Sequence, residues 1–463
     1  MTAMNGISGF ITARIRAGAT LRIFAVALAA LAMLAGAGCS SKPAADKSAA
    51  PAGKLIVISP HWEGIRAEFD RGFSEWLAAN KLPDVKITWL DQGGTSDDMK
   101  FIRAGFSRSP QGIDVDVFYG GGLDPYIELA DAGLLEPFRL PDKELARIPP
   151  ELNGMPLYDK QFRWHGASLA GFGILYNKKL LEMYGLETPD SWEDLASPKF
   201  MDMVGSSDPR HSGSVHMMYE IILQASGWDK GWDILTRIGG NVRNFPKSSG
   251  QIGKDLATGE VAAGLSIDTY AFSAIEQAGA DLLGFVLPAR ATVITPDPVA
   301  ILKGAPNLDN ARLFIRFCVS PEGQKLWMLR KGVPGGPTEF SLNKMSILPE
   351  LYPEGFEKTT NVTANPFAME SGFVYDFEKG AARWELLNDM VGALIIDTHA
   401  DLASGWKKAA GPGKTPPAAA FAPPVSEARA LELARTAWND PVERNKVATS
   451  WFAYARSRYK GLK

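Results

Sequence analysis

The sequence predicts an α/β protein with two lobes, each a sheet flanked by helices, followed by a C-terminal helical extension. From about residue 54 onward, short apolar runs alternate with amphipathic helical patterns, which is typical of layered α/β folds. Two such series follow one another, and several apolar runs end in small or polar residues where a helix begins. The chain has 463 residues, 46% hydrophobic and 22% charged, which is a globular composition with ample material for a core.

The N-terminal segment has the pattern of an export signal. Residues 1–38 contain three arginines and no acid, and the apolar run 23–35 is shorter than the roughly 20 residues that span a bilayer. Small residues directly precede Cys39, as in the lipobox of bacterial lipoproteins, which this segment resembles although Gly36 stands where that motif has leucine. We predict a signal peptide over 1–38, a lipidated Cys39, and a small, polar tether over 39–53; a transmembrane anchor is the alternative.

Charge and cysteine content exclude other classes. The 49 basic and 52 acidic residues give a net charge of −3 without a basic block, so a nucleic-acid partner lacks its electrostatic footprint. The two cysteines cannot form a disulfide framework, and Cys318 is expected to be a buried helix residue.

Residues 54–165 are expected to form the first lobe. Strands are predicted at 55–58, 85–89 and 115–119, and a helix between the first two strands carries Ile65, Phe69, Phe73 and Trp76 at helical spacing. After the third strand come three glycines, 120–122, and then Asp124 and Pro125, which have the pattern of N-cap and first residue of a helix.

Residues 166–285 are expected to form the second lobe. A strand at 170–176 is followed by a helix that Gly185 ends, and Ser191 and Asp194 have the spacing of a capping box. The polar stretch 206–214 precedes another helix, and the strand 261–267 runs into Asp268.

Ligands of open α/β sheets bind beyond the carboxyl ends of the strands, where helix N-termini offer unpaired N–H groups. We therefore expect the polar strand ends of the two lobes to face each other across a cleft. The candidate ligand-binding residues are Trp62, Gly121, Gly122, Arg210, His211, Ser212, Ser249, Asp268 and Tyr270. Each also has a purely structural interpretation: the serines as N-caps, the glycines as a tight turn, and Trp62 as core.

Four motifs resemble the extracellular solute-binding proteins of ABC importers, namely 173–178, 189–195, 208–214 and 320–324. Within this group the chain is most similar to the branch that holds binders of ferric iron, phosphonates, sugar phosphates, thiamine and polyamines. The resemblance covers about residues 54–340 and implies the two-lobed, type II-like periplasmic-binding-protein fold. It implies a crossing to the second lobe near 164–170 and a return near 285–288, so that 286–345 rejoin the first lobe. Ferric binders of this branch present adjacent tyrosines on a second-lobe turn, where this chain has Thr269 and Tyr270.

The function that follows is binding of a small solute, no catalysis, and delivery to the membrane subunits of an ABC importer. The protein is expected to be a lipid-anchored monomer at the periplasmic face or cell surface, without cofactor or metal. Arg210, His211 and Lys247 could hold an anion and Asp268 a cation; the serine- and glycine-rich helix starts favour a phosphorylated, phosphonate or carboxylate solute. A cation such as thiamine, a polyamine or ferric iron is the alternative.

An exported, lipid-anchored hydrolase is the competing class. The sequence has no GxSxG, P-loop or HExxH motif, and its five histidines are scattered.

The C-terminal extension, residues 346–463, exceeds what the resemblance explains. It contains a helical apolar stripe beginning at Trp384, a Pro/Ala linker over 409–424, and a final helix that starts at Asp440 and Pro441. These helices are expected to pack on the first lobe.

Overall fold

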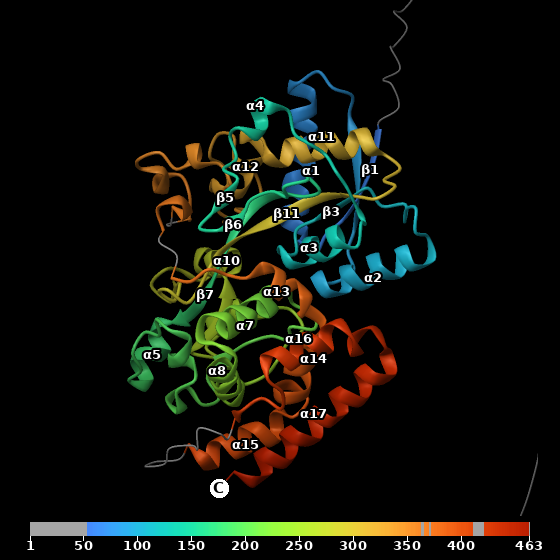
Figure 1. Cartoon of the computed structure of the whole chain (residues 1–463). Coiled ribbons are helices and arrows are strands. Elements are labelled where there is room, and N and C mark those ends of the chain that lie inside the picture. Colours follow the sequence, from blue (N-terminus) through green and yellow to red (C-terminus); the bar gives the residue numbers. More distant parts are fainter. Residues whose placement is uncertain (1–52, 363–364, 370–371, 411–420, 463) are drawn as a thin grey trace, which may run out of the picture. The chain divides into compact units, whose positions relative to one another are not determined.

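The described part of the computed structural model contains a mixed, nine-stranded sheet with the order β2-β1-β3-β11-β7-β9-β8 (Figure 1). β1 (Gly53–Ile58) pairs in parallel with β2 (Val85–Leu90) and β3 (Val117–Tyr119). β8 (Val204–Gly205) pairs in parallel with β9 (Ala263–Ile267), and β4 (Leu135–Glu136) pairs with β11 (Ile294–Leu302). A separate hairpin joins β5 (Glu151–Leu152) to β6 (Met155–Pro156).

The structure describes residues 53–362, 365–369, 372–410 and 421–462, which belong to one compact unit. The predicted signal peptide 1–38, Cys39 with nearly all of its tether, and the central part of the 409–424 linker lie outside the described residues. No helix in the described ranges is both long enough and apolar enough to cross a membrane.

Two strands connect the halves of the sheet. β7 (His165–Asn177) pairs through its first half with β11 and through its second half with β9 and β10 (Leu283–Val286). β11 then continues along β3. The return strand therefore starts at Ile294 rather than near 285–288, because residues 283–286 still pair with β7. We call the part around β1–β4 the first lobe and the part around β8–β10 the second lobe.

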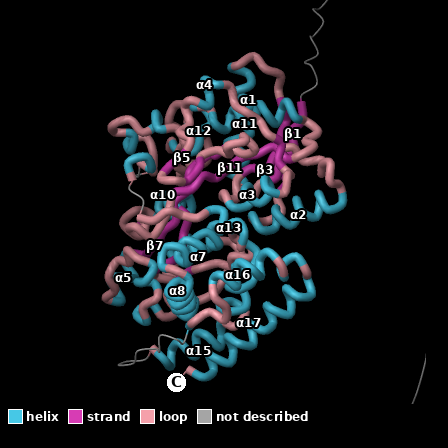
Figure 2. The backbone as a smooth tube through the Cα atoms, in the orientation of Figure 1, coloured by secondary structure: helices cyan, strands magenta, loops and turns pink. Residues whose placement is uncertain are grey.

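Helices cover both faces of the first half of the sheet, as Figure 2 shows. α1 (Glu63–Ala79), α11 (Leu308–Val319) and α12 (Pro321–Met328) pack with Leu55 and Val57 in one core. Ile58 points to the other face, toward α2 (Thr95–Arg108) and α3 (Asp124–Asp131). A short helix, α4 (Asp142–Leu145), follows. The expected apolar stripe of α1 is buried, and so is Cys318, which confirms both predictions.

Two of the second-lobe helices show the predicted end or start signals. α5 (Lys178–Tyr184) ends at Gly185 in the left-handed region, φ 61°. α6 (Trp192–Leu195) starts with the predicted capping box, in which Ser191 and Asp194 exchange hydrogen bonds. The other helices are α7 (Gly213–Ser226), α8 (Trp228–Asn241), α9 (Gly250–Ala257) and α10 (Asp268–Ala278).

The C-terminal extension consists of α13 (Phe377–Ala382), α14 (Trp384–Val391), the π-helical turn Gly392–Ile396, α15 (His399–Ala409), α16 (Glu427–Arg435) and α17 (Pro441–Gly461). As predicted, Asp440 caps α17 and Pro441 is its first residue. Short 3₁₀ turns occupy Pro198–Phe200, Pro349–Leu351, Phe356–Lys358, Pro366–Ala368 and Ala437–Asn439.

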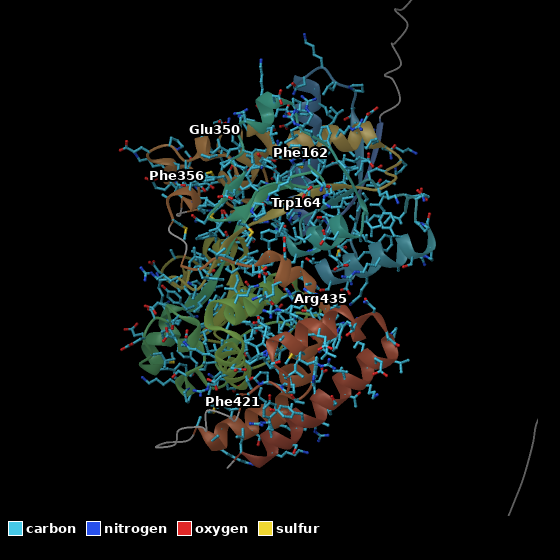
Figure 3. All side chains as sticks on the ribbon, viewed as in Figure 1. Phe162, Trp164, Glu350, Phe356, Phe421 and Arg435 are labelled. Atoms are coloured by element: carbon cyan, nitrogen blue, oxygen red, sulfur yellow. The ribbon has the colours of Figure 1, made fainter. Side chains whose placement is uncertain are left out.

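From α14 onward the helices of the extension pack on the second lobe, so the prediction that they pack on the first lobe was wrong for these helices (Figure 1). α13 packs on α3 of the first lobe, and Ile347, Leu348 and Val362 lie in the first-lobe core. The physical reason lies in two glycines of α8. A Cβ atom at Gly239 would lie 2.4 Å from Ile395, and one at Gly240 would lie 2.8 Å from Trp406. Their missing side chains let the extension approach α8 closely, and Phe421, labelled in Figure 3, contacts the Trp406 ring edge-to-face.

A buried ion pair fixes the extension to α7. The side chains of Arg383 and Glu220 are both fully buried, and Arg383 Nη2 lies 2.6 Å from Glu220 Oε1. Arg383 also pairs with Glu427 of α16 and stacks on Trp228. Burial opposes ionisation of Glu220, but the guanidinium outweighs it and keeps the pKa of this carboxyl below its usual value.

We expect Arg383→Met to lower the free energy of unfolding by about 3–5 kcal/mol, because it leaves the Glu220 carboxylate buried without its charged partner. Urea unfolding followed by tryptophan fluorescence measures this loss. Adding Glu220→Gln to Arg383→Met should restore much of it, because no buried charge remains.

The matched control is Arg429→Met, because Arg429 and Glu432 form an exposed pair whose loss costs less than about 1 kcal/mol. A similarly small loss for Arg383→Met would contradict the anchoring role of the buried pair.

Candidate functional site

A cavity of about 660 Å³ lies between the two lobes. The first lobe contributes Pro60, His61, Thr95 and the loop 121–124, and the second lobe contributes residues 211–214, 247–249 and 269–270. The crossing strands line it with Phe172 and Asp297, and two later segments add Lys344 and Trp384.

The lobes touch each other along one edge of this cavity. The backbone at Gly94 approaches the His211 carbonyl so closely that a Cβ atom would lie 2.2 Å from that oxygen. A Cβ atom at Gly213 would similarly lie 2.8 Å from Thr95 Oγ1. Asp97 Oδ2 lies 3.6 Å from His211 Nδ1. The structure is therefore a closed form, in which a bound solute would lie between residues of both lobes.

The N-terminal ends of five helices border the cavity. The lining includes Thr95 of α2, Asp124 of α3, Gly213 of α7, Ser249 before α9 and Thr269 of α10. Each helix start carries backbone N–H groups without an intrahelical acceptor and a partial positive charge. Their convergence favours a negatively charged group in the cavity.

A chain of serine hydroxyls lies on the second-lobe side. Ser214 Oγ lies 3.2 Å from Ser212 Oγ and 3.1 Å from Ser249 Oγ, and Ser212 caps α7 by accepting from the Val215 N–H. Lys247 lies two residues before Ser249. It is exposed and lines the cavity, and its ammonium group forms no ion pair within the described ranges. This side can therefore offer O–H, N–H and ammonium donors to one ligand group.

Asp297 is the charged centre of the first-lobe side. Its Oδ1 accepts from the Gly122 N–H at 3.0 Å, and its Oδ2 contacts His61 Nε2 at 3.1 Å and the Lys344 ammonium. Gly120, Gly121 and Gly122 all have positive φ, between 83° and 100°, and a Cβ atom at Gly120 would collide with the His61 ring. The triple glycine is thus needed to bring the Gly122 N–H to Asp297.

The protonation states in this cluster follow from burial and pairing. Burial opposes ionisation of Asp297, but Lys344 and His61 outweigh it and hold the pKa of this carboxyl far below its usual range. Burial lowers the pKa of His61 despite its contact with Asp297, so the imidazole is neutral. The cluster therefore holds one carboxylate and one ammonium, and its net charge is close to zero.

Asp124 is the first residue of α3 but not its N-cap, which corrects the sequence prediction. Leu123 occupies the N-cap position, and Asp124 Oδ2 accepts from the Tyr375 hydroxyl of the C-terminal extension at 3.0 Å. Burial, with the nearby Glu220 carboxylate, raises the pKa of Asp124 to about 8. At neutral pH this cavity-lining acid is mainly uncharged.

Six of the predicted ligand-binding residues line the cavity: Gly121, Gly122, His211, Ser212, Ser249 and Tyr270. The polar strand ends of both lobes are thus placed around one space, as expected from the order of elements.

Trp62, Arg210 and Asp268 do not line the cavity. Trp62 packs edge-to-face on Phe340, and Arg210 is held by Asp208 and Asp397. Asp268 is buried, its carboxylate accepts from the N–H groups of Gly171 and Thr269, and burial raises its pKa to about 7. Their polar or aromatic groups are already occupied by the protein itself.

Asp297, Lys344 and Trp384 are among the lining residues that sequence reasoning missed. Asp297 stands between two prolines in an apolar strand. Burying a carboxylate there without partners would cost free energy, so its presence in the sequence could have marked it as a functional residue. Nothing local distinguishes Lys344 or Trp384, because only the tertiary fold brings them to the cavity.

A lobed α/β fold with a donor-rich cavity between the lobes defines a binding protein for small solutes. Residues 116–347 match the family of bacterial extracellular solute-binding proteins, half of the chain, and the chain belongs to this family. It is thus a solute-binding protein of the ABC transporter class, whose members are exported and work with ABC transporter membrane subunits.

Individual relatives are similar in sequence or structure. Phosphoglycerate transport regulatory protein PgtC of Salmonella typhimurium is 32% identical over 159 residues, which cover 34% of this chain and only 39% of PgtC. Periplasmic binding protein AfuA from Actinobacillus pleuropneumoniae, solved with fructose-6-phosphate bound, is 27% identical with a TM-score of 0.57, covering 73% of this chain and 98% of AfuA. The apo ferric ion-binding protein A of Pasteurella haemolytica shares the fold at 17% identity and a TM-score of 0.57, over 73% of this chain and 97% of its own.

The elevated pKa of Asp124 predicts a pH-dependent stability. The folded chain keeps this proton up to about pH 8, whereas the unfolded chain releases it near pH 4, so the group lowers stability as pH rises between these values. Asp124→Asn does not titrate. Its free energy of unfolding relative to the unsubstituted protein should therefore increase from pH 4 to pH 8, by on the order of a few kcal/mol. Chemical unfolding at several pH values measures the difference.

Asp281→Asn is the matched control for the exchange of aspartate for asparagine, because Asp281 is an exposed acid that does not line the cavity. A flat difference for Asp124→Asn would mean that Asp124 is ionised in the folded chain.

Proposed function

We propose that the protein binds a small organic anion, phosphorylated, phosphonate or carboxylate, in the interlobe cavity and delivers it to an ABC importer. The convergence of five helix N-termini on one cavity carries this proposal. Gly121, Gly122, His211, Ser212, Ser249 and Tyr270 are the sequence-predicted contacts, joined by Ser214, Lys247 and Thr95. Solute release then requires the lobes to separate about β7 and β11, as in hinge closure generally.

The charges around the cavity support an anion. Of the acids that line it, Asp297 is neutralised by Lys344, and Asp124 is mainly protonated at neutral pH. Asp97 faces His211, and Lys247 adds a positive charge without an internal partner in the described residues. A ligand phosphate would therefore contact hydrogen-bond donors and would not be repelled by an unpaired carboxylate.

The cationic alternatives have less support. Asp268, which would have to bind an ammonium group, is buried and already accepts two backbone N–H bonds. Trp62 does not contribute an aromatic wall to the cavity. Among the described lining residues Tyr270 is the only tyrosine, so a pair of phenolates for ferric iron is not assembled.

The names of two relatives point to the same solute class. AfuA was solved with fructose-6-phosphate, and PgtC is named for phosphoglycerate transport. Both solutes are phosphate monoesters, which makes this the first class to test for the present chain.

Lys247→Gln should weaken binding of the best phosphate ester by about tenfold, because it removes a charge-assisted hydrogen bond at a partly solvated site. Isothermal titration calorimetry with hexose phosphates, glycerol phosphates and 3-phosphoglycerate measures the change, after a melting-temperature screen has selected the tightest ligand.

Lys254→Gln is the matched control, since Lys254 is an exposed lysine of α9 outside the cavity. This variant should bind the ester with unchanged affinity. Stabilisation by spermidine or thiamine, with no response to any of the anions, would show that the sign of the solute is wrong.

We also propose that the exported protein is anchored as a monomer through a lipidated Cys39, supported by the basic start, the short apolar run and the small residues before this cysteine. Cys39→Ala should move the protein from the membrane fraction to the soluble fraction, because the polar tether offers no hydrophobic anchor of its own. Fractionation with immunoblotting reads this out. Equal membrane association of Cys39→Ala and the unsubstituted chain would refute the lipid anchor.

A further inference from the structure

The C-terminal extension reaches the cavity at Trp384, whose two sequence neighbours form ion pairs with the two lobes. Arg383 is anchored to Glu220 of the second lobe, and Glu385 pairs with Arg103 of the first lobe at 3.0 Å. Trp384, between them, lines the cavity. The indole is therefore positioned by one ion pair to each lobe, although it lies beyond residues 116–347 that match the family.

The ring of Trp384 is held in one orientation. Its centroid lies 3.6 Å from that of His216, and its indole nitrogen lies 3.2 Å from the Asn388 amide oxygen when that amide donates to His216 Nδ1. Burial lowers the pKa of His216 to about 4, so this imidazole is neutral and can accept that bond. With its N–H used inside the protein, the indole offers carbon surface to the cavity.

Other apolar groups extend this surface. Met217 of α7, Phe172 of β7 and Leu123 before α3 also line the cavity. The cavity thus combines polar donors at helix starts with an aromatic and aliphatic wall, and its volume of about 660 Å³ lies in the range of sites for organic molecules.

We propose that Trp384 is a solute-contacting residue that determines specificity, selecting an organic anion with a carbon-bearing body over a bare oxyanion such as inorganic phosphate. This inference rests on the proposed function and adds that the C-terminal extension is part of the binding site. The donors at the helix starts hold the charged group, and the indole packs against the body of the solute.

The experiment compares inorganic phosphate with glycerol phosphate, hexose phosphates and phenyl phosphate by calorimetry, with thiamine and spermidine as cationic probes. The unsubstituted protein should bind its best ester more tightly than inorganic phosphate. Trp384→Ala should lose about tenfold or more in affinity for that ester and leave the affinity for inorganic phosphate within about twofold, since only the ester reaches the ring.

Trp384→Phe and Trp384→Leu keep apolar volume beside His216 and test the same point if the alanine variant is too unstable. Phe should retain more of the ester affinity than Leu. Trp438→Ala is the matched control, because Trp438 is a buried tryptophan of the same extension that does not line the cavity, and its ester affinity should not change.

The two proposals fail in different ways. The role of Trp384 would be overturned if its folded variants bound the ester as tightly as the unsubstituted protein does. It would also be overturned if they lost affinity equally for the ester and for inorganic phosphate. Both results would leave the proposal of anion binding intact. Binding of thiamine or spermidine alone, or of none of the probes, would overturn the anion proposal and this inference with it.

Discussion

The carboxylate of Asp297 joins three other segments of the chain to a strand that crosses between the lobes. It lies on β11, one of the two strands that cross between the lobes, and it receives the Gly122 N–H, His61 and Lys344 from three separate segments. A buried carboxylate is stable only with such a set of partners. The loop after β3, the start of α1 and the 341–348 segment are thereby held at one corner of the cavity, and the positive φ angles of the triple glycine serve this same arrangement.

The extension contributes a second set of contacts that involves both lobes. Arg383 and Trp406 attach it to α7 and α8, while Tyr375 and Glu385 reach Asp124 and Arg103 of the first lobe. Because these contacts lie on both sides of the cavity, opening of the lobes must break or stretch the first-lobe contacts of the extension. The buried Arg383–Glu220 pair makes the second-lobe attachment the more durable one.

The sequence was most informative where local pattern and tertiary role coincide. The stripe of α1, the capping box at Ser191 and Asp194, and the polar starts of α2, α7 and α9 all follow from spacing and could be predicted. The roles of Arg210 and Asp268 could not be predicted. The sequence pattern of a charged residue in a polar loop is the same whether the residue contacts a solute or a partner within the protein. Which lobe the last helices pack on depends on Gly239 and Gly240. Their role is visible only in the folded structure, where Ile395 and Trp406 lie against them.

Gly94 gives the closed form a simple steric limit. Its backbone lies so near the His211 carbonyl that any side chain would meet that oxygen from across the lobe boundary. A methyl group there would act as a wedge between the lobes at the edge of the cavity and shift the equilibrium toward the open form. The affinity of the protein would then fall in proportion to the fraction of molecules able to close, so the absence of one side chain where the lobes meet helps to set how tightly the solute is held.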